Sequence, residues 1–358
     1  MHNEMNVGNA GEAKCGTGAG KTDAYNGSEF AGEACQFELP WEVSLKEACV
    51  SARQFLASCG VEDAAVDAWY LLEYVTGISR AVYLADGDRR MNSEQRNAYA
   101  KCVKRRGAHI PLQYLTGEQE FMGFSFLVNE HVLIPRQDTE TLVELGLKIS
   151  GRHDSPCRVL DLCTGSGCIA ISMAKLWGQQ GIRPVGSENR ELQLCGRMAA
   201  DGWQLCEQKA RDELQIYASD ISEDALAVAR ENARRLDVDV QFIQSDLFAQ
   251  IPAQVFDMVV SNPPYIRTSV VEELSEEVQK HEPRLALDGG ADGLDFYRRI
   301  IRESPQYLCP GGYLLLEIGY DQGAVVADLM RENGFSCVQI TKDLPGNDRV
   351  VSGRSGTC

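Results

Sequence analysis

From Arg158 to the end of the chain, apolar runs that suit buried strands alternate with runs of helical periodicity. The expected strands are Arg158–Leu162, Leu214–Ser219, Val240–Gln244, Met258–Ser261, Tyr313–Glu317, Val338–Thr341 and Arg349–Ser352. The expected helices include Cys168–Leu176, Glu223–Arg235, Gly293–Leu308 and Gly323–Asn333. This alternation predicts an α/β domain whose mostly parallel sheet is covered on both faces. Only Asp343–Asn347 separates the last two strands, so they are expected to pair antiparallel.

The part of the chain before residue 137 lacks this alternation and divides into three segments. Residues 1–40 are rich in Gly, Ala, Asn and Glu without apolar periodicity, so a disordered extension is expected. Residues 41–117 carry apolar side chains at helical spacing, which predicts a small helical bundle with a recognition or packing role. Residues 118–136 are rich in aromatic and β-branched side chains and are expected to form a β-hairpin linker.

Local signals give more specific expectations within these segments. The expected helices of the bundle are Ser44–Ser58, Asp63–Val75 and Asn92–Arg106, with Gly60, Gly77 and Gly107 as C-caps. The hairpin is expected to turn at Val128-Asn129-Glu130. Farther along, residues 178–213 exceed the usual loop length and are interpreted as an insertion of unknown purpose, with room for a short helix around Glu191–Arg197.

Charge and composition restrict the class of partner. The formal net charge is −17, which disfavours naked DNA or RNA as substrate because phosphate binding requires a basic face. No apolar run is long enough to cross a bilayer, and no signal peptide is apparent. A soluble, cytoplasmic protein without membrane or direct nucleic-acid contacts is expected, and a monomer is assumed.

Two further patterns are interpreted as carrying no chemistry. The 13 cysteines include no C-x-x-C pair and the five histidines do not cluster, so no metal site is expected. The cysteines are expected to be small buried hydrophobic side chains rather than disulfide partners. Cys15–Thr22 nearly fits a phosphate-binding P-loop, but Cys15 replaces the first Gly and no strand precedes it, so an NTPase is not favoured.

The first candidate site is the loop within Val159–Ile169, where a buried apolar strand meets the start of a helix. Gly165 and Gly167 allow the backbone to approach a ligand closely, and the helix start offers unpaired N–H donors. The third Gly of the dinucleotide fingerprint is missing. The loop resembles motif I of the class I methyltransferases, D-x-G-x-G-x-G, which implies S-adenosylmethionine as cofactor. The cofactor-binding residues implied here are Asp161, Cys163, Thr164, Gly165, Ser166 and Gly167. Cys163 replaces the motif's first Gly, and an ordinary φ is expected there because positive φ would strain a Cys.

The ends of the next two strands supply further cofactor candidates. Asp220 suits a hydrogen bond to ribose hydroxyls, although it can also cap the helix that begins near Ser222. In class I methyltransferases the following strand end flanks the adenine. Asp246 is therefore expected to accept from the exocyclic amine and Leu247 to cover the ring, with an ordinary polar strand end as the alternative.

The strongest motif is Asn262-Pro263-Pro264-Tyr265, directly after a buried strand. The two prolines stop the strand and fix its exit direction. Asn262 then stands at the carboxyl end of a central strand, where doubly wound folds bind ligands. The tetrapeptide resembles the catalytic motif of methyltransferases that act on planar nitrogens.

The chemistry of a planar nitrogen explains these residue types. An amide or aryl amine nitrogen is a poor nucleophile because its lone pair is delocalised. The Asn262 side-chain oxygen can accept one N–H and the Pro263 carbonyl the other, which aims the lone pair at the methyl group. The Tyr265 ring can lie on the planar group. Asn262, Pro263 and Tyr265 are thus expected to be catalytic, Pro264 to complete the substrate site, and Asn262 also to contact the cofactor.

The order of segments over residues 45–354 resembles the HemK/PrmC family, the glutamine-N5 methyltransferases of peptide chain release factors. The matching segments are Pro111–Gly117, Phe121–Phe126, Val132–Glu140, the motif I loop, Asp220, Gln244–Asp246, Asn262–Ile266, Glu282–Leu287, Asp292–Leu294, Glu317–Gly319 and Lys342–Arg349. The departures are the extension, Cys163 and the insertion.

This resemblance implies a class I, Rossmann-like methyltransferase domain at residues 137–358, with a mostly parallel seven-stranded sheet, after a helical substrate-recognition domain and a hairpin linker. The implied substrate is the glutamine of the Gly-Gly-Gln loop of bacterial release factors. Arg136 and Glu140 either shape the substrate entrance or form an interdomain salt bridge. The alternatives are a ribosomal-protein glutamine methyltransferase, a nucleic-acid amino-methyltransferase and a non-catalytic cofactor-binding scaffold.

Overall fold

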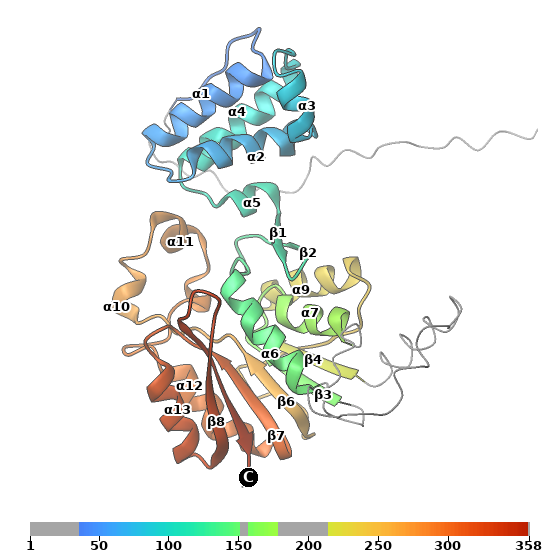
Figure 1. Ribbon diagram of the computed structural model, residues 1–358, viewed down its shortest axis with the longest axis vertical. Helices are drawn as coiled ribbons and strands as arrows, with labels where there is room; N and C mark the ends of the chain where they lie inside the picture. The colour runs from blue at the N-terminus through green and yellow to red at the C-terminus, as the bar shows by residue number, and fades with distance from the viewer. Residues whose placement is uncertain (1–35, 151–156, 178–213, 357–358) are drawn as a thin grey trace, which may run out of the picture. The chain divides into compact units, whose positions relative to one another are not determined.

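The computed structural model describes residues 36–150, 157–177 and 214–356 (Figure 1). A bundle of helices comes first, a two-stranded hairpin follows, and an α/β domain with a seven-stranded sheet makes up the rest. Residues 1–35, including the P-loop-like segment, and the insertion at 178–213 lie outside the described residues. Within the described ranges, none of the helices combines the length and the apolar character that a bilayer crossing requires.

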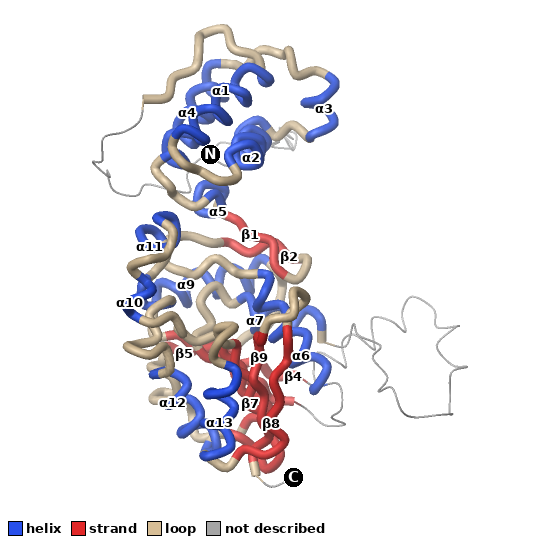
Figure 2. The backbone as a smooth tube through the Cα atoms, turned by 60° about the vertical axis from the view of Figure 1, so that its left-hand side comes forward, coloured by secondary structure: helices blue, strands red, loops and turns tan. Residues whose placement is uncertain are grey.

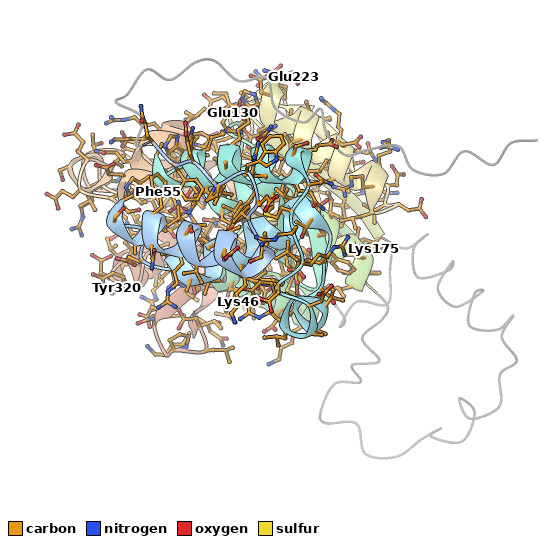
Figure 3. The ribbon with its side chains drawn as sticks, turned by 90° about the horizontal axis from the view of Figure 1, so that it is seen from above. Lys46, Phe55, Glu130, Lys175, Glu223 and Tyr320 are labelled. Carbon is orange, nitrogen blue, oxygen red and sulfur yellow. The ribbon has the colours of Figure 1, made fainter. Side chains whose placement is uncertain are left out.

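The bundle is built from five helices that local sequence signals start and stop. They are α1 (Leu45–Ser58), α2 (Ala64–Thr76), α3 (Arg80–Ala85), α4 (Ser93–Gly107) and α5 (Leu112–Thr116). A capping box begins α1, where Ser44 and Glu47 satisfy each other's backbone N–H groups, and a second one begins α4. Phe37 is buried and its ring lies 4.9 Å from that of Phe55, which Figure 3 labels. The bundle therefore includes residues before the expected boundary at 41.

The expected glycine C-caps are correct at two of three positions. Gly77 caps α2 with a left-handed backbone, and Gly60, also left-handed, follows the C-cap of α1. Gly107 is instead the last residue of α4, so its expected capping role is wrong. A Cβ there would lie 2.6 Å from the Phe55 ring, so the missing side chain permits close packing between helices.

The hairpin turns earlier than expected. Strand β1 (Glu118–Phe121) pairs antiparallel with β2 (Phe124–Leu127), and Met122 and Gly123 form the two-residue loop. Both loop residues have positive φ, which matches the twist of the flanking strands. The prediction of a turn at Val128–Glu130 is wrong for the hairpin. Asn129 does form a local turn, by accepting from the His131 N–H, but it lies after β2.

The seven-stranded sheet has the order β5-β4-β3-β6-β7-β9-β8. Its strands are β3 (Cys157–Leu162), β4 (Leu214–Asp220), β5 (Gln241–Gln244), β6 (Phe256–Ser261), β7 (Leu308–Glu317), β8 (Phe335–Lys342) and β9 (Asp348–Ser355). The first five strands in this order run parallel, and β9 is antiparallel to both of its neighbours. The predicted fold class is confirmed, including the antiparallel pairing of the last two strands.

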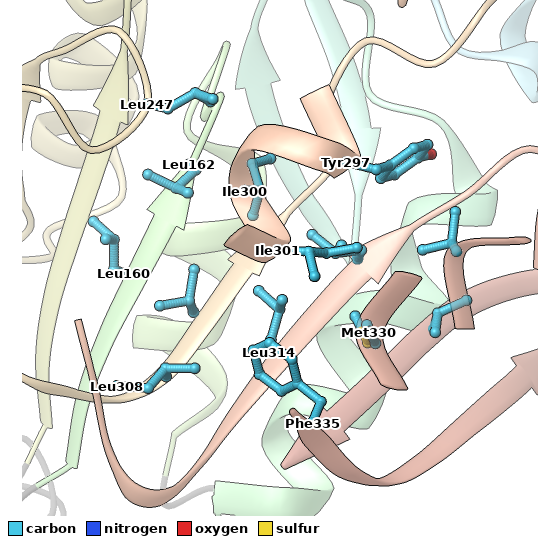
Figure 4. Close-up of a cluster of buried hydrophobic side chains, with 14 of the residues drawn as sticks. Leu160, Leu162, Leu247, Tyr297, Ile300, Ile301, Leu308, Leu314, Met330 and Phe335 are labelled. Carbon is cyan, nitrogen blue, oxygen red and sulfur yellow. The ribbon is translucent and has the colours of Figure 1, made fainter. Parts of the chain in front are cut away.

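Helices cover both faces of this sheet (Figures 1 and 2). One face packs against α6 (Glu140–Ser150), α7 (Cys168–Leu176) and α9 (Glu223–Arg235), and the other against α12 (Asp295–Glu303) and α13 (Gly323–Glu332). Residues alternate between the two cores along a strand, so that in β6 Val259 joins the α12 and α13 side and Val260 the α6 and α7 side. Figure 4 shows the core on the α12 and α13 face, in which Tyr297, Ile300 and Ile301 of α12 pack on the sheet.

One helix expectation fails at its end. Gly293–Leu308 is expected as a single helix, but α12 ends at Glu303, a 3-10 turn covers Ser304–Gln306, and Leu308 already begins β7. Pro305 in that turn lacks a backbone N–H and ends the α-helical hydrogen bonding. The residues 309–312 then bulge out of register with β6 before regular pairing resumes at Tyr313.

The cysteines depart in part from the expectation of buried hydrophobic side chains. Among the described free cysteines, Cys157 and Cys168 are buried, whereas the others are half-buried. Cys337 on β8 is disulfide-bonded, so the expectation is wrong there.

The buried side chain of Asn232 on α9 ties the hairpin to the α/β domain. Its Oδ1 accepts from the Leu127 N–H at 2.6 Å, and its Nδ2 donates to the Leu127 carbonyl at 3.0 Å. The same Nδ2 donates to the Ser166 carbonyl at 2.9 Å, in the loop after β3. Nearby, Lys175, labelled in Figure 3, lies over the Phe124 ring of β2. One carboxamide therefore holds together the hairpin, α9 and the glycine loop.

We expect Asn232→Ala to lower the free energy of unfolding by about 2–4 kcal/mol, because three buried or half-buried backbone groups lose their partner. Urea denaturation of the full chain measures this change. Arg234→Ala, which alters an exposed side chain on the same helix, is the matched control and is expected to change stability by no more than about 0.5 kcal/mol. Equal stabilities for the two variants would contradict the anchoring role.

Candidate active site

The carboxyl ends of the parallel strands meet at one edge of the sheet. Leu162 of β3 pairs with Ser219 of β4 on one side and with Ser261 of β6 on the other. The residues that follow these strands therefore come together, as doubly wound sheets require of a ligand site. One cavity at this edge is lined by seven of the predicted site residues: Cys163, Gly165, Asp220, Asp246, Leu247, Asn262 and Pro264.

The glycine loop is built from left-handed backbone conformations at alternate positions. Cys163, Gly165 and Gly167 have φ of 59°, 54° and 81°. The expectation of an ordinary φ at Cys163 is therefore wrong. The loop imposes this conformation because the Thr164 N–H is held by the Ser219 carbonyl at 2.9 Å, which fixes the path just after Cys163. A non-glycine residue in this region costs roughly 1–2 kcal/mol.

The two glycines serve different purposes. A Cβ on Gly165 would meet nothing within 4 Å, and this residue lines the cavity. A Cβ on Gly167, the N-cap of α7, would lie 2.8 Å from Ile171 and 3.1 Å from Ala229. Gly165 therefore leaves room beside the cavity, whereas Gly167 allows α7 and α9 to pack.

Asp161 is fully buried behind the loop and does not line the cavity. Its Oδ2 accepts from the Thr164 hydroxyl at 2.6 Å and from the Ala170 N–H at 3.3 Å. Its Oδ1 has no hydrogen-bond partner among the described residues. Burial raises the pKa of Asp161 to about 7, against the opposing effect of these two hydrogen bonds. Thr164, Ser166 and Gly167 likewise lie outside the residues that line the cavity.

Asp220 combines contacts to the loop and to α9. Its Oδ2 accepts from the Gly165 N–H at 2.9 Å and its Oδ1 from the Ser222 N–H at 3.0 Å. The N-cap of α9 is Ser222, whose hydroxyl accepts from Ala225, so Asp220 supports the helix start without being its cap. Burial raises the pKa of Asp220. Its carboxylate still lines the cavity.

Asp246 and Leu247 are adjacent in the chain but differ in how far their side chains are exposed. Asp246 is exposed and pairs with Arg299 of α12 at 2.8 Å, and both line the cavity. Leu247 is buried and has a φ of 51°, with its side chain against the same cavity. No local pattern singles out Arg299, because one arginine within a predicted helix looks the same as an ordinary surface charge.

Asn262 follows β6 and is half-buried at the cavity wall. Its Nδ2 donates to the hydroxyl of Thr139 at 3.3 Å, and no described residue donates to its Oδ1. Thr139 lies in the 3-10 turn η1 (Gln137–Thr139) just before α6 and is buried. Sequence reasoning missed it, since it lies 123 residues away from Asn262 in the chain.

The segment after Asn262 is held by close backbone contacts. The Tyr265 carbonyl accepts from Gln322 at 3.0 Å, and Ile266 exchanges backbone hydrogen bonds with Leu287 and Gly289. A Cβ on Gly289 would lie 2.7 Å from Tyr265 Cα, so only glycine permits this approach. Pro263 and Tyr265 do not line the cavity. Burial raises the pKa of Tyr265 well above its usual range, so its phenol stays neutral.

Arg136 and Glu140 do not contact one another. Arg136 pairs with the buried carboxylate of Glu282, which also accepts from the Ile134 N–H. Glu140 accepts from the Met122 N–H at 2.8 Å in the hairpin turn. Neither lines the cavity, although Pro283, next to Glu282, does. Arg136 thus holds a segment that borders the cavity, and Glu140 holds the hairpin.

Known proteins resemble both parts of the chain. The family described as PrmC N-terminal domain matches residues 47–117, and the family described as methyltransferase small domain matches residues 195–291. The release factor glutamine methyltransferase of Geobacter sulfurreducens is 39% identical over 304 residues, which cover 85% of this chain and 94% of the relative. The proteins of the same name from Moorella thermoacetica and Caulobacter vibrioides are 39% and 36% identical and are covered to 97% and 96%, over 86% and 87% of this chain.

The parallel sheet with one antiparallel strand, the site at its carboxyl edge and the methyltransferase match define an S-adenosylmethionine-dependent class I methyltransferase. Identity of this extent over nearly the whole length of the relatives sets the family as well. The chain belongs to the release factor glutamine methyltransferase family.

We expect Cys163→Gly to be more stable than Cys163→Ala by about 1 kcal/mol, since both variants lose the sulfur but only glycine relieves the left-handed strain. Urea denaturation of the two variants side by side measures the difference. An alanine variant at least as stable as the glycine variant would show that this position carries no strain.

Proposed function

We propose that the enzyme transfers a methyl group to the side-chain amide nitrogen, N5, of the glutamine in the Gly-Gly-Gln loop of bacterial release factors. The observation that carries this proposal is the Asn262 carboxamide, which lines the cavity with its nitrogen engaged by Thr139 and its oxygen unengaged by the described residues. The relatives are named release factor glutamine methyltransferases, which supports a glutamine amide as the methyl acceptor and a release factor as the protein that carries it.

The residues around the cavity fit S-adenosylmethionine. The cofactor carries a sulfonium, an ammonium and a carboxylate, and the cavity wall includes the carboxylates of Asp220 and Asp246 and the Arg299 guanidinium that pairs with Asp246. The space beside Gly165 admits a ligand against the backbone, and the orphaned Asp161 Oδ1 is a buried acceptor behind the same loop. Asp220 would hold the ribose hydroxyls, Asp246 the adenine amine and Leu247 the ring face, with Cys163–Gly167 around the remainder. When bound, the cofactor supplies an electrophilic methyl group on a positively charged sulfur.

The protein's own contribution is to hold a weak nucleophile in place. Asn262 Oδ1 accepts one amide N–H of the substrate and the Pro263 carbonyl accepts the other, so the nitrogen lone pair points along the direction of transfer. Tyr265 and Pro264 confine the planar amide, and the neutral phenol of Tyr265 brings no charge to it. A neutral amide would need no base before attack. As the nitrogen–methyl bond forms, the carbon–sulfur bond breaks with its electron pair left on sulfur, the positive charge passes to the nitrogen, and one N–H proton is then released to water.

The remaining parts of the proposal concern partners. The helical segment at 41–117, most of which matches the PrmC N-terminal domain, serves as the substrate-recognition domain. The linker at 118–136 shapes the substrate entrance. Arg136, its last residue, does so through its ion pair with Glu282, and Glu140 fixes the hairpin by accepting from the Met122 N–H. The enzyme acts as a cytoplasmic monomer without direct nucleic-acid contact, in keeping with its net charge of −17.

The decisive experiment incubates the full chain with S-adenosylmethionine and a bacterial release factor, and maps the added methyl by mass spectrometry. A methyl on the glutamine of the Gly-Gly-Gln loop, absent from a release factor with that glutamine changed to alanine, is the expected result. Parallel reactions with ribosomal proteins and with DNA or RNA test the alternatives. Methylation of one of these, and none of the release factor, would overturn the proposed substrate.

We expect Asn262→Ala to bind S-adenosylmethionine nearly as well as the parent enzyme and to lose most of its turnover, about 100-fold or more. Calorimetric titration of the cofactor and single-turnover methylation measure the two properties separately. Asp220→Ala is the matched comparison, because it is expected to weaken cofactor binding instead. If Asn262→Ala chiefly lost cofactor binding, its proposed role toward the substrate would be wrong.

A further inference from the structure

The proposed chemistry places a strict demand on the orientation of Asn262. A carboxamide has an oxygen that accepts and a nitrogen that donates, and the two ends have nearly the same shape. Turned by half a rotation, Asn262 would present N–H groups to the substrate amide, and the substrate N–H that Oδ1 should accept would have no acceptor. Something near Asn262 must therefore distinguish its two ends.

Thr139 is the only described side chain that hydrogen-bonds to this carboxamide, with 3.3 Å between Nδ2 and Oγ1. Its side chain is buried, with 2% of the residue exposed. A hydroxyl can donate one hydrogen bond and accept others. Thr139 alone thus cannot choose between the two ends of Asn262, since it could equally donate to Oδ1.

Glu317 resolves this ambiguity. It is the last residue of β7, and because Leu316 pairs with Ser261 of β6, Glu317 and Asn262 follow adjacent positions at the sheet edge. The residue is 1% exposed. Hydrogen bonding from the side chains of Thr139 and Tyr265 lowers the pKa of its carboxyl group, so both hydroxyls lie near it. An ionised carboxylate only accepts, so the Thr139 proton points toward Glu317 and leaves a lone pair toward Asn262.

We propose that Glu317 and Thr139 are positioning residues that fix the orientation of Asn262. The hydrogen bonds run in one direction: Thr139 donates to Glu317, Asn262 Nδ2 donates to Thr139, and Asn262 Oδ1 is left to accept from the substrate amide. This inference rests on the proposed role of Asn262, and it adds two residues to which no role in the reaction has been assigned above.

The surroundings of Glu317 make its charge sensitive to pH. Burial raises its pKa to about 7, while Thr139, Arg349 and Tyr265 oppose that rise and the nearby Asp138 adds to it. Arg349 comes from β9 and is itself shared with Asp138 and Asp343. Tyr297 of α12 donates to the Glu317 backbone carbonyl, and Cys168 of α7 also lies within its electrostatic reach. Oε2 has no hydrogen-bond partner among the described residues.

A protonated Glu317 no longer obliges Thr139 to donate toward it, so the orientation of Asn262 is lost. Turnover is therefore present above about pH 7, where the carboxylate is ionised, and falls as the pH drops through that value. Since Thr139 transmits the effect, a variant without its hydroxyl should not show this acid limb.

The test compares Thr139→Val, which keeps the shape and removes the hydroxyl, with Thr139→Ser, which keeps the hydroxyl. We expect kcat of Thr139→Val to fall about tenfold, the value of one hydrogen bond, with KM for the release factor and cofactor affinity unchanged. Thr139→Ser should retain the parent kcat. The unfolding temperature of each variant, measured with cofactor bound, shows whether it is folded.

The pH profile of kcat separates positioning from packing. The parent enzyme and Thr139→Ser should share an acid limb near pH 7, and Thr139→Val should lack it. Glu317→Gln, whose side chain does not titrate, should lack it too, and this variant keeps the inference testable if Thr139→Val does not fold. An unchanged kcat in Thr139→Val, or an acid limb that persists with the same midpoint in Thr139→Val or Glu317→Gln, would overturn the inference. Inactivity of Asn262→Ala alongside either result leaves the proposed function standing, whereas full activity of Asn262→Ala would remove it.

Discussion

The active site depends on the parallel pairing of β6 with β3 on one side and β7 on the other. Leu162, Ser261 and Leu316 lie side by side in the sheet, so the next residues along each chain, Cys163, Asn262 and Glu317, emerge at one edge. The glycine loop, the proposed catalytic tetrapeptide and the buried carboxylate are far apart in sequence. No interaction between neighbours in the chain places these three segments together, and the register of the sheet brings them to the same edge.

Much of this arrangement follows from patterns that a sequence displays directly. The strand-and-helix alternation predicts the sheet, and the two prolines after Ser261 locate the strand end at Asn262. These signals are local, because each depends on residues within one element. Thr139 could not be found in this way, since its importance comes from its distance to Asn262 and not from its neighbours in the chain. Glu317 reads from sequence as the polar end of a buried strand, and its burial beside two hydroxyls is a tertiary property.

The local errors share a different cause. Met122 and Cys163 adopt the left-handed conformation, which sequence reasoning reserves for glycine and asparagine. Each is held there by contacts that its own side chain does not reveal, such as the Thr164 N–H bond to Ser219 that fixes the backbone after Cys163. Conversely, Gly107 has a helical backbone, and its missing side chain serves packing against Phe55. A glycine in sequence signals either backbone freedom or close approach, and only the folded neighbours decide which.

The buried acids at this edge place stability and activity in opposition. Asp161 and Glu317 each have a folded-state pKa raised to about 7, above their unfolded values. A group of this kind binds more protons in the folded chain, so the stability it contributes is full below the unfolded pKa and is lost as the pH rises through about 7. Ionised Glu317 is nevertheless the form that directs Thr139 and hence Asn262. In the proposed mechanism, the active enzyme thus needs this carboxylate in the charged state that destabilises the fold, because that state turns the amide oxygen of Asn262 toward the substrate.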